Sequence, residues 1–102
     1  MNPSERRRHG RTQVSLPASL EKGGVKTPGV MRDVSIGGAF LSTSGSFAYG
    51  DAVIVHVHLP GLDSEIAVPS TIRWIDTDGC GVQFGVMGVR ETHALVELAK
   101  RS

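Results

Sequence analysis

Apolar side chains alternate with polar or small ones along most of this chain, and glycine or proline interrupts the alternation at short intervals. The clearest example is residues 52–59, where Val53, Val55 and Val57 are each separated by one residue. A period of two is typical of a strand with one buried face. Because 13 glycines and 5 prolines punctuate several such stretches, the chain is predicted to be all-β, as a small barrel or sandwich.

Six strands are expected from this pattern, and a length of 102 residues fits a single domain. Their expected ranges are residues 12–21, 25–33, 38–43, 52–59, 66–75 and 80–86. In the fifth range, Val68, Ile72 and Trp74 are expected to share one face. A bulge or bend is expected at Pro28-Gly29. Pro69 is expected at an edge or a bulge, because proline cannot donate to a ladder.

Two further segments complete the expected fold. Lys22-Gly23-Gly24 predicts a tight turn that joins the first two strands as a hairpin. From Val89 to Arg101 the period becomes helical, with one polar arc and one mostly apolar arc. This segment is predicted to be an amphipathic helix that packs on the strands.

Positive charge is concentrated at the N-terminus. Residues 1–11 hold four arginines and one glutamate, a net charge of +3, whereas residues 12–102 carry a net charge of −2. Because residues 1–11 have little apolar content, we expect a flexible arm, for which a solvated tail is the simplest interpretation. Such local charge suits a small anion better than a nucleic-acid polymer or a membrane surface, because there are no interleaved aromatics and no amphipathic period.

The segment from residue 31 to residue 41 reads MRDVSIGGAFL and contains the clearest candidate binding motif. The spacing of Asp33 and Ser35 points both side chains to one face of an extended segment. Gly37 and Gly38 can kink the chain and let a flat ligand approach the backbone. A hairpin turn is the alternative, in which Asp33 and Ser35 only satisfy local backbone donors.

An Arg-x-x-x-Arg spacing at Arg7 and Arg11 precedes this Asp-x-Ser-x-x-Gly motif by roughly two dozen residues. This ordered pair resembles the PilZ domain family, bacterial receptors for the second messenger cyclic di-GMP. The resemblance covers nearly the whole chain. It implies a six-stranded antiparallel β-barrel with a C-terminal α-helix over residues 12–102, and an Arg-rich ligand-binding arm over residues 1–11. It also implies that the ligand contacts the motif positions, which are Arg7, Arg11, Asp33, Ser35 and Gly38.

The chemistry of these residue types suits cyclic di-GMP. A guanidinium fork can bond to guanine O6 and N7, bind phosphate or stack over a purine. Asp33 can accept hydrogen bonds from guanine N1–H and the exocyclic amine. Arg6 and Arg8 are expected to contact phosphate. Trp74 is either a core residue or, as the resemblance implies, a residue that stacks on the ligand.

Other kinds of site are disfavoured. His56 and His58 share a face of the fourth expected strand, but a metal site would need His9 or His93 as a distant third ligand. Ser35 has no histidine at a recognisable spacing, Cys80 lies in a core-like alternation, and no carboxylates form an acid–base pair. No enzyme is expected.

The expected location is the cytoplasm. The single cysteine permits no internal disulfide, and no apolar run is long enough for a membrane helix or a secretion signal. Two functions remain open. The first is a cyclic di-GMP receptor that signals to a separate, unidentified partner protein. The second is a PilZ-like protein-interaction domain that works without nucleotide.

Overall fold

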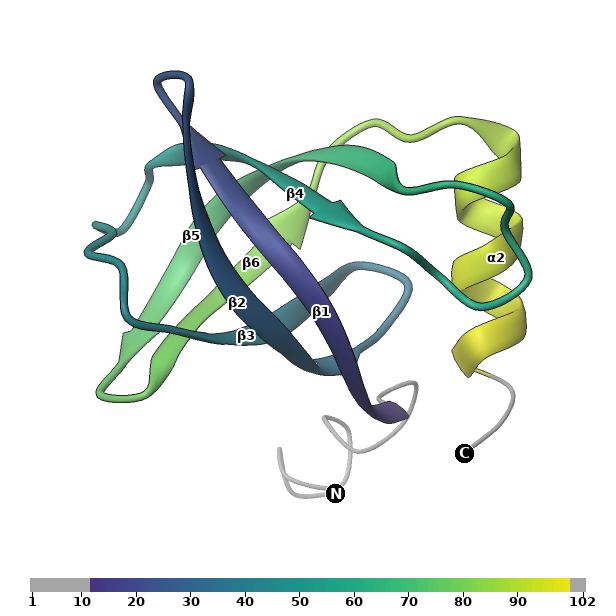
Figure 1. The fold of residues 1–102 in the computed structure, drawn as a ribbon, viewed down its shortest axis with the longest axis horizontal. Coiled ribbons are helices and arrows are strands. Elements are labelled where there is room, and N and C mark those ends of the chain that lie inside the picture. Colours follow the sequence, from purple (N-terminus) through teal and green to yellow (C-terminus); the bar gives the residue numbers. More distant parts are fainter. Residues whose placement is uncertain (1–11, 100–102) are drawn as a thin grey trace, which may run out of the picture.

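The computed structural model describes residues 12–99, which form a six-stranded antiparallel β-barrel with one C-terminal helix (Figure 1). The strands are β1 (Thr12–Lys22), β2 (Val25–Val34), β3 (Gly38–Thr43), β4 (Ala52–Val57), β5 (Ile66–Asp76) and β6 (Gly79–Phe84), and the helix is α2 (Val89–Ala99). Their order around the barrel is β1-β2-β3-β6-β5-β4, and pairing of β1 with β4 closes it. The predicted fold class is confirmed.

The hairpin between β1 and β2 forms where the sequence predicts it. Lys22 pairs with Val25, so the turn consists of Gly23 and Gly24 alone. Their φ angles are 60° and 85°. A two-residue hairpin of this hand needs positive φ at both positions, which glycine adopts without steric cost.

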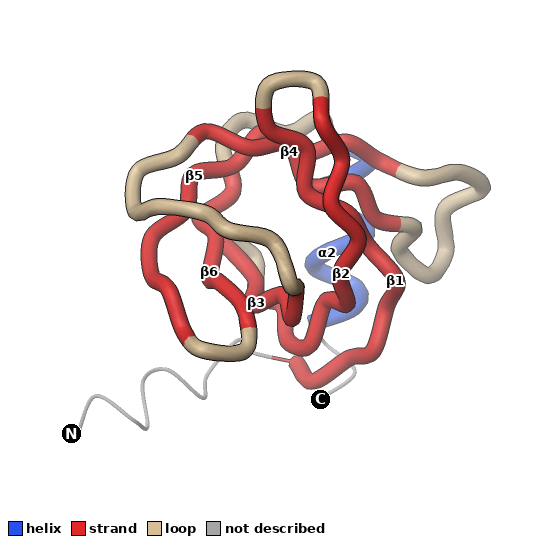
Figure 2. The backbone as a smooth tube through the Cα atoms, turned by 60° about the vertical axis from the view of Figure 1, so that its left-hand side comes forward, coloured by secondary structure: helices blue, strands red, loops and turns tan. Residues whose placement is uncertain are grey.

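The core lies inside the barrel and at the end covered by α2. Val53, Val55 and Val57 of β4 are at most 3% exposed, as their alternation predicts. β4 ends two residues earlier than expected, although Leu59 remains fully buried. Figure 2 shows the ring of strands with α2 behind it. The helix adds three buried side chains to the same core, namely Ala94, Leu95 and Leu98.

The strands contain three irregularities, none of them at the expected position. Pairing continues without a shift through Pro28-Gly29, so the prediction of a bulge there is wrong. The register instead shifts in β1 between Gln13 and Leu16, in β2 between Met31 and Asp33, and in β5 between Ile72 and Trp74. Each shift adds residues to one strand that have no counterpart on its partner, which reorients the side chains that follow.

Pro69 lies at neither an edge nor a bulge, contrary to expectation. It pairs in register with Ile54 of β4, inside a closed barrel. Its carbonyl accepts a hydrogen bond from the N–H of Gly85 at 2.7 Å. The backbone nitrogen and oxygen of a strand residue point to the same side of the strand. The Pro69 nitrogen, which carries no hydrogen, therefore faces the end of β6. The β4–β5 ladder on the other side loses no hydrogen bond.

The last strand and the helix differ from expectation at their ends. β6 ends at Phe84, and Val86, expected to continue its alternation, is 91% exposed in the connection to α2. The helix begins at Val89 as predicted. Its expected end at Arg101 lies outside the described residues.

Candidate functional site

A bulge in β2 turns Asp33 to the outside of the barrel. In strict alternation Asp33 would face the same way as Met31, which is fully buried. The register shift adds Arg32 as an extra residue, so Arg32 and Asp33 both lie outside and Val34 returns to the core at 1% exposure. The Asp33 side chain is therefore half-buried on the outer surface.

A second bulge, in β5, does the same for Trp74. Ile72 is fully buried, and the register shift adds Arg73 as the extra residue. Trp74 is 39% exposed, and its indole ring covers Gly81, where a Cβ atom would lie 1.8 Å from the ring. The expectation that Trp74 shares the buried face of Ile72 is wrong, as is its interpretation as a core residue, because the bulge reverses the alternation.

Together the two bulges place Asp33 and Trp74 in one row across the outside of the barrel. Directly opposed residues on neighbouring antiparallel strands share a face. The row follows the pairing from β1 through β2, β3 and β6 to β5, and we call it the outer row: Gln13, Asp33, Phe40, Gly81 and Trp74. It combines a carboxylate, an amide and two aromatic rings on one face.

Ser35 and Gly37 lie in the connection between β2 and β3, and Gly38 begins β3. Ser35 donates its backbone N–H to the carbonyl of Gly38 at 2.8 Å, and its hydroxyl lies 3.4 Å from the same oxygen. The carbonyl of Gly37 accepts from the N–H of Phe84 at 2.8 Å. The serine thus makes local backbone contacts, but its hydroxyl donates to a carbonyl, whereas the hairpin-turn interpretation has it accept from a backbone N–H.

Neither Gly37 nor Gly38 has the left-handed backbone that a glycine kink would use. Positive φ occurs at Gly23, Gly24, Gly50 and Gly61 among residues 12–99, so neither Gly37 nor Gly38 provides a left-handed kink. A Cβ on Gly38 would lie 2.2 Å from the carbonyl oxygen of Val82, whereas one on Gly37 would meet nothing within 4 Å. The backbone of β6 thus approaches Gly38 closely.

The Arg-rich arm, with Arg6, Arg7, Arg8 and Arg11, lies outside the described residues. The described chain begins at Thr12, which pairs with Val34. The arm is therefore joined to the barrel beside the outer row.

A contact missed by sequence reasoning lies next to Trp74. The guanidinium carbon of Arg73 is 5.7 Å from the centre of the Tyr49 ring, a cation–π distance. Tyr49 and Arg73 are separated by 24 positions in the sequence. The only available signal is a tyrosine within a glycine-containing loop, which is too common to identify a site.

The loop that carries Tyr49 is held at three points. Gly50 N–H donates to the carbonyl of Ile72 at 2.8 Å, beside Arg73. The Asp51 carboxylate accepts from Lys22 Nζ and from the backbone N–H of Ala48, both at 2.8 Å. The hydrogen bond from Lys22, followed by that from Ala48, lowers the pKa of Asp51 below its ordinary value of 3.8. The anchor is therefore an ion pair at neutral pH.

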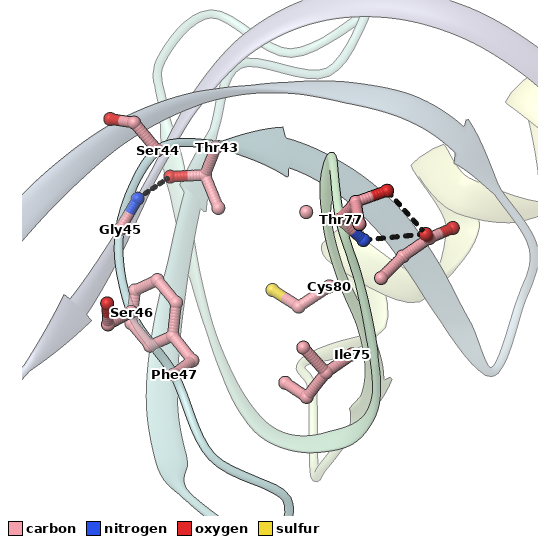
Figure 3. Close-up of a pocket in the computed structure, with 10 residues that line it drawn as sticks. Thr43, Ser44, Gly45, Ser46, Phe47, Ile75, Thr77 and Cys80 are labelled. Atoms are coloured by element: carbon pink, nitrogen blue, oxygen red, sulfur yellow. Dashed lines mark hydrogen bonds between the residues drawn. The ribbon is translucent and has the colours of Figure 1, made fainter.

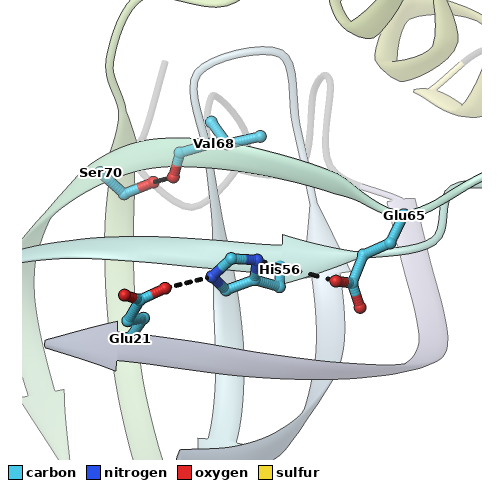
Figure 4. Close-up of polar contacts among 5 residues, drawn as sticks. All are labelled: Glu21, His56, Glu65, Val68 and Ser70. Atoms are coloured by element: carbon cyan, nitrogen blue, oxygen red, sulfur yellow. Dashed lines mark hydrogen bonds and ion pairs between the residues drawn. The ribbon is translucent and has the colours of Figure 1, made fainter. Parts of the chain in front are cut away.

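His56 of β4 lies between two glutamates (Figure 4), whereas His58, just beyond the end of β4, has a different partner. His56 Nε2 lies 2.8 Å from Glu21 Oε1, and its Nδ1 lies 3.7 Å from Glu65 Oε1. His58 Nε2 instead lies 2.6 Å from the carbonyl oxygen of Leu62. Within residues 12–99, no three potential metal-ligating side chains come together.

A pocket of about 270 Å³ lies between the β3–β4 loop and the β5–β6 turn (Figure 3). Phe47, Ile75 and Cys80 form its apolar part. Burial raises the pKa of the Cys80 thiol, which keeps it protonated and unreactive. None of the predicted site residues lines this pocket, so the outer row is the better candidate site.

Comparison with known proteins identifies the family. A family model described as the PilZ domain matches residues 5–101. No curated protein matches the chain significantly. No helix within residues 12–99 has the length and apolar character to cross a membrane.

Solved structures with the same fold include two PilZ-type relatives. The crystal structure of the PilZ domain of CeSA from a cellulose-synthesizing bacterium has a TM-score of 0.68 at 19% identity, covering 89% of this chain and 95% of that one. The Bacillus subtilis inhibitor of motility (MotI/DgrA) has a TM-score of 0.73 at 16% identity, covering 89% of this chain and 48% of that one. This chain therefore spans about half the length of the inhibitor.

Proposed function

The chain belongs to the PilZ domain family, a family of cyclic di-GMP receptors, and from this premise we propose that it binds cyclic di-GMP on the outer row. PilZ domains are non-catalytic receptor domains. The observation that carries the proposal is the outer row itself. Asp33 and Trp74 lie at separate positions of this row, with Phe40 between them and Gly81 beneath the indole ring.

Each end of the row suits a different part of the ligand. The Asp33 carboxylate accepts hydrogen bonds from N1–H and the exocyclic amine of a guanine, which no other common base offers together. The Trp74 indole, which is 39% exposed, stacks on a purine. Ser35 follows Val34 in the chain and adds a polar group at the β2–β3 connection.

We further propose that the ligand orders the N-terminal arm. Arg7 and Arg11 bind guanine edges or phosphate, and Arg6 and Arg8 contact phosphate. The attachment of the arm at Thr12, opposite Val34, supports this arrangement because it brings these residues within reach of the row. Ordering such a segment costs roughly 2–5 kcal/mol, so several charge-assisted contacts must form together.

The output of the receptor is a separate protein partner in the cytoplasm. Closing an arm of charge +3 over an anionic ligand changes the surface beside the barrel, and a partner can recognise that change. A PilZ-like interaction domain that binds its partner without nucleotide is the alternative.

Titration calorimetry of the full chain with cyclic di-GMP tests the receptor function. Arg7→Ala, Arg11→Ala and Asp33→Ala should each weaken binding at least about tenfold, because each removes a hydrogen bond to a charged group. Arg6→Ala and Arg8→Ala should weaken binding less than these variants. Equal losses for all the arginines would indicate nonspecific electrostatic attraction to the positively charged arm. No binding at high micromolar ligand would favour the nucleotide-independent alternative.

Amide exchange of residues 5–11, with and without cyclic di-GMP, tests the ordering of the arm. Protection should appear only when the ligand is bound. Equal protection with and without ligand would contradict ordering of the arm and would favour a preformed pocket.

A further inference from the structure

We propose that Arg73 and Tyr49 form a second guanine-recognition element of this site. In this arrangement the Arg73 guanidinium, seated on the Tyr49 ring, bonds to O6 and N7 of the guanine that stacks on Trp74. The inference rests on the proposed function and names the residues that read the second base of the same ligand.

The β5 bulge is the first step of the argument. It leaves Arg73 and Trp74 as consecutive residues that both lie outside the barrel, whereas regular strand geometry would point them to opposite faces. Trp74 covers Gly81 on the β6 side. The guanidinium and the indole thus come from consecutive residues on the outer surface, the indole over Gly81 and the guanidinium over Tyr49.

The β3–β4 loop is the second step. Gly50 N–H donates to Ile72 O at 2.8 Å, and Ile72 N–H donates to Asp51 O at 2.9 Å, so this loop extends the β4–β5 ladder alongside the bulge. Tyr49, which is 67% exposed, therefore flanks Arg73 on the side away from Gly81. The ring limits the conformations of the arginine, which lowers the entropy that binding has to overcome.

The donors of Arg73 are the third step. Within residues 12–99 no carboxylate forms a salt bridge with Arg73, whose guanidinium lies over the Tyr49 ring. A guanidinium that lies over a ring keeps its in-plane N–H groups for other acceptors. These donors are available to a ligand.

The acceptor geometry of guanine is the fourth step. Guanine presents two acceptors, O6 and N7, that match a guanidinium fork, whereas adenine replaces one of them with an amine donor. When a guanine stacks on Trp74, its O6 and N7 lie in the plane of the base and stay accessible to a side chain at its edge. Arg73 therefore favours guanine over adenine at this position.

The separation of Asp33 and Trp74 is the last step. They lie on β2 and β5, which are three strand spacings apart in the barrel order, about 14 Å along the surface. A single base cannot reach both. Asp33 and Arg73 therefore read different guanines, which requires a ligand with two of them.

The experiment uses Trp74 as its reporter, since it is the only tryptophan in the chain. The full chain is titrated with cyclic di-GMP and with cyclic di-AMP, and binding is followed by Trp74 fluorescence and by calorimetry. Arg73→Ala should weaken cyclic di-GMP binding about tenfold and reduce the preference over cyclic di-AMP. Arg90→Ala, which removes the same charge from exposed α2, should stay within about twofold of the unaltered chain.

Three more variants test whether the fork of the guanidinium, and not only its charge, is needed, and whether the Tyr49 ring supports it. Arg73→Lys keeps the charge but loses the fork, so it should resemble Arg73→Ala, and full rescue by lysine would overturn the guanine contact. Tyr49→Phe keeps the ring and should bind normally, whereas Tyr49→Ala should bind several-fold more weakly.

Failure of the unaltered chain to bind cyclic di-GMP would refute the receptor function. Normal affinity and base preference in Arg73→Ala would refute this inference alone.

Discussion

The bulges in β2 and β5, which we call the β2 corner and the β5 corner, both bring a functional side chain to the surface of the barrel, but the side chains differ in chemistry. In the β2 corner the extra residue is Arg32 and the next residue, Asp33, joins the outer row. In the β5 corner the extra residue is Arg73 and the next residue, Trp74, joins it. Both corners move a residue to the surface that simple alternation would have turned into the core.

The corners differ in how their arginines are used. Arg32 Nε donates to the hydroxyl of Ser42 at 3.1 Å, so this guanidinium braces the barrel surface and leaves recognition to Asp33. Arg73 lies over Tyr49, which leaves its donors for a ligand. The position of a bulge thus decides which side chain is exposed, and the neighbouring strand or loop decides what that side chain can recognise.

The glycines beside the two corners also differ. The Cβ position of Gly38, near the β2 corner, is blocked by the Val82 carbonyl, whereas that of Gly81, under the β5 corner, is blocked by the Trp74 ring. A backbone carbonyl within a closed barrel cannot move away, but a half-exposed side chain can rotate. Substitution at the two glycines should therefore have different consequences.

The largest expected effect is that of Gly38→Ala. Its methyl group would meet the Val82 carbonyl at 2.2 Å. We expect the free energy of unfolding to fall by about 3 kcal/mol and the melting temperature by more than about 10 °C. Gly37→Ala is the matched control, because its methyl group is in open space, and it should stay within about 0.5 kcal/mol. Equal melting temperatures for the two variants would contradict the assigned role of Gly38.

The next effect concerns binding at both corners. Asp33→Ala should cost about 1.5–3 kcal/mol of cyclic di-GMP affinity and Trp74→Ala about 1–3 kcal/mol. If the corners read separate guanines, the two losses should add to within about 0.5 kcal/mol in the double variant. Calorimetry of the four proteins measures this, and strong coupling would mean that both residues contact the same base.

A smaller effect on stability is expected for Gly81→Ala. The new methyl group displaces the Trp74 ring, which can rotate into solvent at a cost of about 1 kcal/mol in unfolding free energy. The emission of the single tryptophan should shift to the red in the absence of ligand. An unchanged emission spectrum would show that the ring does not rest on Gly81.

The smallest effect is the pH dependence of the β5 corner. The lowered pKa of Asp51 means that its ion pair with Lys22 stabilises the Tyr49 loop above pH 3.8 and is lost as pH falls through the lower, folded-state pKa. NMR signals of Tyr49, the only tyrosine, should therefore change in this acid range and not between pH 5 and pH 7. In Asp51→Asn this acid transition should disappear, and its persistence would assign it to another group.

The sequence predicted the framework of this protein because the framework depends on local preferences. A period of two marks the buried face of β4, and the Gly23-Gly24 pair meets the φ requirement of its turn. The helical period after Val89 marks α2. The spacing of Asp33, Ser35 and Gly38 within one short segment was likewise visible in the chain alone, as was the family that this spacing resembles.

Only the tertiary structure decided which residues share the outer row. A bulge belongs to a pair of strands, so the exposure of Trp74 depends on the register of β5 against β6 and not on the residues around it. The need for glycine at position 38 comes from a carbonyl 44 positions away, on Val82. The contact of Arg73 with Tyr49 likewise forms only when the barrel closes, because long-range pairing brings together segments that no local pattern connects.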